Sequence, residues 1–221
     1  NSSVTTLSKD GESRFLFIGL DGVATYNNDS TSNVFIYDLV YGNFSIPGAI
    51  TKSGSSVGAE INTFYYDGNY KVYVGGDFDT ASALPCQSFC TFDMEAQRWE
   101  NDASTSISSG VINYMNITSE SDQLLIAGEF VISGSSYFFT NYDFDDQSFK
   151  TLDRFATTSI KKRDDDSSSS SSSSGSTAAI PGEINRYILV DGAVTSGNRM
   201  LVLGDNFVSG YNKSNWVRLD T

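Results

Sequence analysis

The sequence predicts an all-β protein, built as a β-propeller of four-stranded blades, with about four blades present as part of a larger propeller. Three observations support this prediction. The chain is rich in residues that favour strands and tight turns, with 15 Phe, 12 Tyr and 19 Gly against 3 Pro in 221 residues. A set of three sequence anchors recurs along it in the same order. The spacing of these anchors is nearly constant, which is typical of stacked repeat units.

Each anchor corresponds to one expected strand. The first is an apolar residue followed by Asn or Thr, which begins at Val4, Ile61, Ile112 and Ile184. The second is an apolar run that ends in Gly, at 15–19, 72–76, 124–128 and 200–204. The third is a strand-like run that ends in Asp, at 34–38, 89–93, 138–143 and 216–220. The repeat is about 50 residues long, a length typical of propeller blades.

A fourth, outer strand is predicted by an aromatic residue that follows the third anchor, at Phe44, Trp99 and Phe149. These aromatic residues fit packing between blades better than a sugar-stacking surface, because repeated units repeat their core residues. The last copy ends its third anchor at Asp220, so we expect the final blade to lack its outer strand and the natural polypeptide to continue. The predicted domains are blades one to three in 1–153, an insertion in 154–182 and an incomplete fourth blade in 183–221.

The predicted insertion is basic, then acidic, then serine-rich. A polyserine tract has no apolar side chains to offset the entropy lost on ordering, so we expect a disordered loop. Lys162 and Arg163 form a dibasic pair in this loop, which is what a secretory processing protease of the kexin type requires. The alternative is a solvated block of charge in a linker.

The net charge of -13 makes nucleic acid and anionic membrane surfaces unsuitable partners, because both repel an acidic protein. No apolar stretch approaches the roughly 20 residues needed to span a bilayer. The sequence also opens without a signal-peptide pattern, so we expect any targeting or anchoring segment to lie outside it.

The two cysteines, Cys86 and Cys90, are close enough to form a local disulfide in an oxidising compartment, although two separate thiols are the alternative. Sequons for N-glycosylation begin at Asn1, Asn28, Asn43, Asn116 and Asn212. About four would arise by chance in a chain of this composition, so they permit a secretory route without establishing one.

The chain contains no His, which removes the usual general base and the commonest metal ligand. Acidic residues recur near the Gly anchors and could converge to hold a cation or serve a glycosidase: Asp21, Asp77, Glu129 and Asp205. The alternative is a repeated structural carboxylate that accepts hydrogen bonds from nearby amides. The Asp that ends each third anchor is expected to shape the following turn. We therefore predict no catalytic residue, no metal and no cofactor.

Two glycine-rich runs carry a family resemblance. Residues 72–78, VYVGGDF, and 124–130, LLIAGEF, resemble the repeats of the fungal cortical markers for cell polarity, the Rax family. The stretch 84–93, LPCQSFCTFD, followed by Trp99, is the most specific part of the resemblance. Gly-Gly pairs and spaced aromatic residues are also found in kelch-type propellers generally, so a kelch-like blade is expected.

The resemblance implies a non-enzymatic landmark module in bud-site selection, on the extracellular side of the plasma membrane at sites of polarised growth. It further implies a membrane anchor outside this segment and a multi-pass membrane protein as partner. The alternative function is a carbohydrate-binding or glycosidic propeller that uses the recurring carboxylates, since a fold does not determine a function.

Processing at the dibasic pair can be tested by denaturing electrophoresis of the secreted protein. Cleavage gives two bands that converge to one in a variant carrying Lys162→Ala and Arg163→Ala. A single band from the unmodified protein would show that the pair is only a charged part of the linker.

Overall fold

The computed structural model describes residues 2–27, 30–55, 58–101, 107–118, 121–150, 184–190, 199–204, 207–212 and 215–218. These residues form strands and turns without any helix, as the all-β prediction requires. The chain divides into two compact units, Asn1–Thr151 and Leu152–Thr221, which are described separately below.

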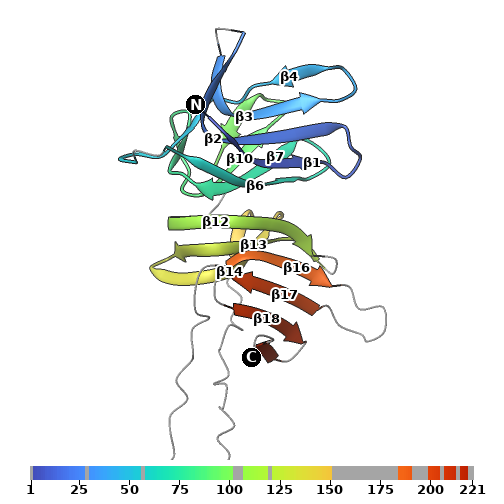
Figure 1. Ribbon diagram of the computed structural model, residues 1–221, viewed down its shortest axis with the longest axis vertical. Coiled ribbons are helices and arrows are strands. Elements are labelled where there is room, and N and C mark those ends of the chain that lie inside the picture. Colours follow the sequence, from blue (N-terminus) through green and yellow to red (C-terminus); the bar gives the residue numbers. More distant parts are fainter. Residues whose placement is uncertain are drawn as a thin grey trace, which may run out of the picture. The chain divides into compact units, whose positions relative to one another are not determined.

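The first unit contains three antiparallel four-stranded sheets (Figure 1). The first sheet consists of β1 (Val4–Lys9), β2 (Phe15–Tyr26), β3 (Ser30–Asp38) and β4 (Asn43–Ser45). The second sheet consists of β6 (Glu60–Tyr66), β7 (Lys71–Asp77), β10 (Phe89–Asp93) and β11 (Arg98–Glu100). The third sheet consists of β12 (Ile107–Thr118), β13 (Ser121–Ile132), β14 (Ser135–Asp143) and β15 (Ser148–Lys150). Each sheet keeps its strands in chain order, as expected for blades joined by hairpins.

The strand register confirms that the sheets are copies of one unit. The aromatic residue of each outer strand lies opposite the residue that precedes the turn Asp, in the pairs Tyr37–Phe44, Phe92–Trp99 and Tyr142–Phe149. In the first strands, Ile61 lies opposite Gly76 and Ile112 lies opposite Gly128. The anchors found in the sequence therefore occupy equivalent places in the second and third sheets.

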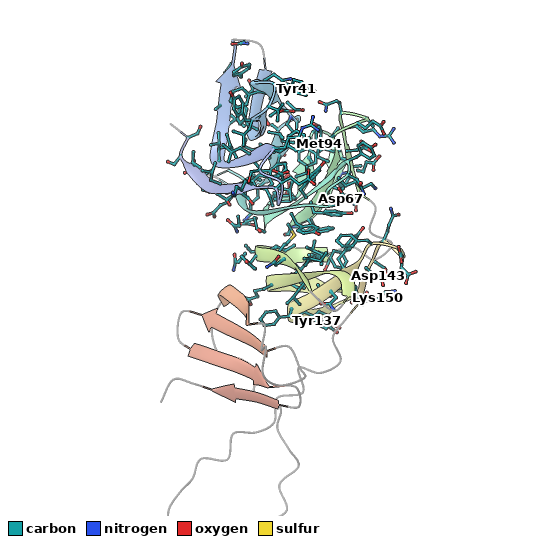
Figure 2. All side chains as sticks on the ribbon, turned by 90° about the vertical axis from the view of Figure 1, so that its right-hand side faces the viewer. Tyr41, Asp67, Met94, Tyr137, Asp143 and Lys150 are labelled. Carbon is teal, nitrogen blue, oxygen red and sulfur yellow. A yellow bond between two sulfur atoms is a disulfide. The ribbon has the colours of Figure 1, made fainter. Side chains whose placement is uncertain are left out.

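Apolar side chains fill the spaces between neighbouring sheets (Figure 2). One cluster joins the first and second sheets and includes Phe17, Ile36, Ile61 and Val74. A second cluster joins the second and third sheets through Tyr73, Phe89, Ile112, Leu124 and Tyr142. Ile61 and Ile112, the first-anchor residues, are both completely buried. Both faces of the second sheet are thus covered, one by each neighbour.

Glycines in the second strands of the sheets allow two different close approaches. A Cβ at Gly19 would lie 2.7 Å from Cγ2 of Ile61, and one at Gly75 would lie 2.6 Å from Cγ2 of Ile112, so these positions admit the neighbouring sheet. A Cβ at Gly76 would instead lie 2.1 Å from the carbonyl oxygen of Glu60, in the paired strand of the same sheet. Gly76 therefore admits the backbone of the paired strand, while the contact between sheets falls on Gly75.

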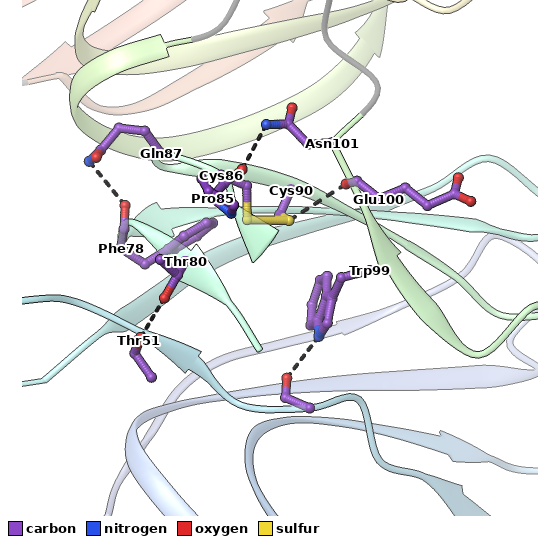
Figure 3. The surroundings of a disulfide bond; sticks show 11 residues. Thr51, Phe78, Thr80, Pro85, Cys86, Gln87, Cys90, Trp99, Glu100 and Asn101 are labelled. Atoms are coloured by element: carbon purple, nitrogen blue, oxygen red, sulfur yellow. Dashed lines mark hydrogen bonds between the residues drawn. A yellow bond between two sulfur atoms is a disulfide. The ribbon is translucent and has the colours of Figure 1, made fainter. Parts of the chain in front are cut away.

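A small three-stranded sheet connects the first repeat to the second. It consists of β5 (Ile50–Thr51), β8 (Thr80–Ala81) and β9 (Leu84–Pro85), in the order β5-β8-β9. Beside it, a disulfide joins Cys86 to Cys90, whose Cα atoms are 5.5 Å apart (Figure 3). Both cysteines are buried in the cluster between the first and second sheets. The disulfide holds the start of β10 against the hairpin that precedes it.

The second unit contains the fourth sheet, which has four strands where the sequence analysis expected three. Its strands are β16 (Ile184–Val190), β17 (Arg199–Gly204), β18 (Phe207–Asn212) and β19 (Asn215–Arg218). Tyr211 lies opposite Trp216, which is the register of Tyr142 and Phe149. The outer strand was missed because Asn212 replaces the expected Asp and the following turn is two residues shorter. The proposed insertion at 154–182 lies outside the described residues and stays a prediction.

The glycine contact between sheets predicts a specific destabilisation. Changing Gly75→Ala should lower the free energy of unfolding by about 1–3 kcal/mol, because the added methyl group overlaps Ile112. Gly11→Ala is the matched control, since no atom lies within 4 Å of a Cβ there. Urea unfolding of both variants measures the difference.

Combining Gly75→Ala with Ile112→Ala should cost less than the sum of the two single changes, because the second substitution removes the overlapping atom. Equal effects of Gly75→Ala and Gly11→Ala would contradict the proposed packing between the second and third sheets.

Candidate binding groove on the inner strands

The first strands of the three sheets lie side by side and share an irregularity. The register of β1, β6 and β12 shifts at Thr5, Asn62 and Asn113 respectively, which places a β-bulge at the same point of each strand. The fourth sheet has the same shift at Asn185. A bulge leaves one residue outside the regular hydrogen-bond ladder, so its side chain is available for another partner.

The bulged side chains connect each sheet to the next. The Thr5 hydroxyl donates to the carbonyl oxygen of Ile61 at 2.6 Å, and the Asn62 amide nitrogen donates to the carbonyl oxygen of Ile112 at 3.1 Å. These bonds explain why the first anchor requires Asn or Thr after its apolar residue. They also hold β1, β6 and β12 as one wall.

This wall carries a groove of about 420 Å³. Residues from all three first strands line it, together with the turn after β1: Thr6, Ser8, Lys9, Asp10, Tyr65, Tyr66, Tyr114 and Asn116. The two charged members are already engaged, since Lys9 donates to the Ser13 hydroxyl at 2.9 Å and Asp10 accepts from the Phe15 amide at 2.7 Å. The rest of the lining consists of hydroxyl groups, side-chain amides, aromatic rings and the apolar side chains of Leu7 and Met115.

Tyr66 adds to the neutral character of the groove. Burial raises the pKa of its phenol above 10.0, and the negative charges of Asp67 and Asp10 act in the same direction. Its hydroxyl donates to the carbonyl oxygen of Asn69 at 2.5 Å. A groove of this chemistry suits a neutral polar ligand or an extended peptide, which can hydrogen-bond and pack on rings at the same time.

The Asp at the end of each third strand organises the following turn. Oδ1 of Asp38 accepts hydrogen bonds from the amides of Val40 and Tyr41, at 2.8 and 3.0 Å. Asp93 and Asp143 each accept the equivalent two amides of their own turns. The three residues are therefore separate turn caps, as the sequence analysis expected for the Asp of the third anchor.

These hydrogen bonds change the pKa values of two of the carboxyl groups. Burial alone would raise the pKa of Asp38, but the amides of Tyr41 and Val40 and the Arg14 guanidinium outweigh it and hold the pKa below its usual value. The Asp146 amide is the main cause that lowers the pKa of Asp143, with help from the Asp145 amide and from Lys150, which lies at the same end of the third sheet (Figure 2).

The acidic residues near the Gly anchors do not form a cluster among the described residues. Asp77 forms an ion pair with Lys52, and Asp21 accepts the Ser3 amide at 2.6 Å. Glu129 is exposed on β13, and Asp205 lies outside the described residues. Across the described part of the chain, no group of three or more His, Cys, Asp or Glu residues is placed to hold a metal ion.

The aromatic residues of the outer strands all serve packing: Phe44 packs within its own sheet, while Trp99 and Phe149 pack against the clusters that join neighbouring sheets. The ring of Phe44 lies 4.7 Å from that of Tyr37, and Trp99 lies 5.2 Å from Phe92. The Trp99 indole also donates to the carbonyl oxygen of Gly48 at 2.8 Å (Figure 3). Phe149 is buried in the second cluster. All three serve packing, in agreement with the sequence analysis, and none lines the groove.

The candidate modification sites occupy different surroundings. Asn43 is exposed on the outer strand β4, where a glycan would extend into solvent. Asn116 lines the groove and is half-buried, so a glycan there would occupy it. Asn212 lies in β18, while Asn28, Lys162 and Arg163 lie outside the described residues. No helix long and apolar enough to cross a bilayer occurs in the described ranges.

Sequence reasoning did not find the groove. The anchors located its supporting residues, Thr5 and Asn62, but the lining residues differ from one repeat to the next and carry no pattern. Their common feature is position, since each follows a bulge on a first strand. Polar residues placed shortly after the first anchor are the signal that could have located it.

Comparison with known proteins finds a matching family and a curated relative. A family profile described as "Rax2 C-terminal beta propeller domain" matches residues 34–221. The curated protein "Polarized growth protein RAX2" of Candida albicans is 30% identical over 231 residues, an alignment that covers 100% of this chain. The chain spans 15% of the length of that protein.

The turn carboxylates predict a loss of stability in acid. Because the folded pKa of Asp143 lies below its usual value of 3.8, its contribution is complete above that value and is lost as the pH falls through the folded pKa. Asp143→Asn should therefore lower the free energy of unfolding at about pH 7, and its difference from the unchanged protein should shrink towards about pH 3. Urea unfolding at the two pH values measures this.

Asp145→Asn is the matched control, since Asp145 contributes its backbone amide rather than its carboxyl group to the same turn. A difference between Asp143→Asn and the unchanged protein that stays constant with pH would show that the carboxylate does not stabilise the turn through its charge.

Proposed function

The chain belongs to the Rax2 C-terminal β-propeller family, and on that premise we propose that it is a non-enzymatic binding module of a fungal polarity protein. In this proposal the module acts as a landmark that marks sites of polarised growth and takes part in bud-site selection. The inner groove is the surface through which it recognises its partner.

The observation that carries the proposal is that the candidate catalytic carboxylates lie outside the groove on the inner strands. Of the carboxylates that could have served catalysis, Asp77 is paired with Lys52, Asp21 accepts the Ser3 amide and Glu129 is exposed on β13, and none of these three lines the groove. The groove on the inner strands is lined mainly by hydroxyl, amide, tyrosine and apolar groups, and its two charged side chains are Lys9 and Asp10. Such a surface can bind a partner but offers no general acid and base pair.

We place the module on the extracellular side of the plasma membrane. A buried disulfide between Cys86 and Cys90 supports an oxidising compartment, since disulfides persist mainly in secreted and surface proteins. The exposed sequon at Asn43 is compatible with the same route. The proposed partner is a multi-pass membrane protein of the bud-site machinery, and a membrane anchor is expected outside this segment.

Carbohydrate binding is the second candidate, and the groove lining favours it. Tyrosine rings beside side-chain amides suit the apolar faces and hydroxyl groups of a sugar. The glycosidic version requires two carboxylates on either side of the bond that is cleaved, and Asp77 is paired with Lys52. Glycan binding that disappears on changing Ser8→Trp would favour binding in the groove, and hydrolysis that disappears on changing Asp77→Ala and Glu129→Ala would favour the glycosidic version.

The landmark proposal is tested by blocking the groove in the fungus that makes the protein. Ser8→Trp places a large ring in the groove and should displace new growth sites to the extent seen in a deletion strain. The matched control is Glu95→Trp, which adds the same ring to an exposed outer turn and should leave growth sites unchanged. The measurement is the position of successive growth sites, with surface amounts of each variant compared by immunoblot.

Normal growth-site positions with Ser8→Trp, in a background where deletion displaces them, would show that the groove is not the recognition surface. Normal positions in the deletion strain itself would show that the landmark role is wrong.

A further inference from the structure

A second pocket lies at the end of the second and third sheets where the turn after β6 meets the turn after β14. It has a volume of about 350 Å³, and its lining includes three aromatic residues and two charged ones: Tyr65, Tyr73, Phe144, Asp67 and Lys71. Asp67 directly follows β6 and is labelled in Figure 2. Apart from Tyr65, which lines both, this pocket shares no residue with the groove on the inner strands.

The aromatic residues of this pocket come from two sheets. The rings of Tyr65 and Phe144 stack with their centroids 5.9 Å apart and their planes at 19°. The Tyr73 ring lies 5.3 Å from that of Phe144 and 6.2 Å from that of Tyr65. Tyr73 is buried, whereas Tyr65 and Phe144 are half-buried and leave part of each ring open to the pocket. The pocket therefore has an aromatic wall.

The repeat does not require rings at these positions. Tyr65 stands where the first and third sheets have Ser8 and Asn116, as the strand registers show. Phe144 directly follows the turn Asp of its sheet, where the second sheet has Met94. Packing between sheets therefore calls for an apolar residue at the position of Phe144 but not for a ring, and it calls for neither at the position of Tyr65.

Asp67 gives the pocket a carboxylate that has no cationic partner among the described residues. Its Oδ1 accepts hydrogen bonds from the amides of Asn69 and Lys71, at 2.8 and 3.1 Å, while its Oδ2 accepts none from the part of the chain that the structure describes. Lys71 is in an ion pair, since its Nζ lies 3.2 Å from Oε2 of Glu100, whose Oε1 contacts Arg98. The pocket thus offers a negative charge beside aromatic rings, in a chain of net charge -13.

We propose that this pocket binds the Lys or Arg side chain of a partner protein. A cation is attracted to the face of an aromatic ring, and a carboxylate within reach adds a charge-assisted hydrogen bond. The aliphatic stem of the same side chain packs on apolar surface, which Ile117 supplies in this lining at 37% exposure. A neutral sugar would stack on the rings but would gain nothing from the charge of Asp67.

The position of Tyr65 favours a side chain over a free amine. Because Tyr65 lines both cavities, a backbone that lies along the groove can direct its basic side chain into the pocket. A free amine would use the pocket alone. The proposal concerns a different cavity from the one used in the landmark proposal, and its test is binding in vitro rather than the position of growth sites.

The test uses the full-length protein and a probe peptide, Gly-Lys-Gly, with a diazirine acyl group at its N-terminus and an amide at its C-terminus. After irradiation, mass spectrometry measures the probe attached to residues 65–73 and 144–147. We expect acetyl-Gly-Lys-Gly-amide to halve this labelling at a concentration about fivefold lower than acetyl-Gly-Gln-Gly-amide does, because only the Lys peptide carries a cation. Methyl glucoside and n-butylamine should compete less well than the Lys peptide.

Three variants locate the effect. Asp67→Asn keeps the oxygen that accepts the two turn amides but removes the charge, and it should reduce the labelling about three- to fivefold. Glu95→Gln, the matched control, removes the same charge from an exposed residue outside the pocket and should leave the labelling unchanged. Phe144→Met introduces the residue that the second sheet has at the equivalent place, so the fold tolerates it, and should reduce the labelling to a similar extent as Asp67→Asn.

Equal competition by the Lys and Gln peptides would overturn the proposal, and so would unchanged labelling in Asp67→Asn and Phe144→Met or the absence of labelling at this pocket. Stronger competition by methyl glucoside would overturn it in favour of a sugar site. Competition by n-butylamine as strong as that by the Lys peptide would overturn it in favour of a site for free amines.

Discussion

The first unit depends on the burial of apolar faces between neighbouring four-stranded sheets. A completely buried Ile, Leu or Phe side chain contributes roughly 1.5–3 kcal/mol relative to an exposed one, and each space between sheets contains several. Val72 and Val74 face the first sheet while Tyr73 faces the third, so both faces of the second sheet are buried. A single sheet of this kind would leave half of its apolar residues in water, which is why the repeat and the fold are inseparable.

This constraint explains the residues that recur. Ile61 and Ile112 fill the space against the preceding sheet, Gly19 and Gly75 provide that space, and the bulged Thr5 and Asn62 hydrogen-bond across it. The turn Asp residues act at the opposite end of each sheet, where Asp38, Asp93 and Asp143 cap the turn that leads to the outer strand. A carboxylate that is needed in every copy to hold a turn is poorly placed to become a catalytic group in one of them.

The features that could be predicted from the sequence are those that recur in every copy of the repeat. The all-β class, the repeat, the turn role of Asp38 and the packing role of Phe44 could be predicted, because each reflects a local requirement repeated along the chain. The outer strand of the fourth sheet could not, since Asn212 in place of Asp and a shorter turn moved Trp216 into the pattern of a third strand. The contact of Gly75 with Ile112 could not be predicted either, because sequence spacing does not show where a bulge shifts the register. The groove was missed because its lining does not repeat.

That lack of repetition is itself informative about function. Ser8, Tyr65 and Asn116 occupy the same register position of three successive first strands, yet they differ in size and chemistry. Earlier in the same strands, Val4, Ile61 and Ile112 are all β-branched aliphatic residues, and the last two fill the space between sheets. Equivalent positions under the same structural constraint carry similar residues. Variation at equivalent positions therefore means that the fold does not determine which residue stands there. The groove is where the repeat permits each sheet to differ, which is what the proposed role in recognising one partner requires.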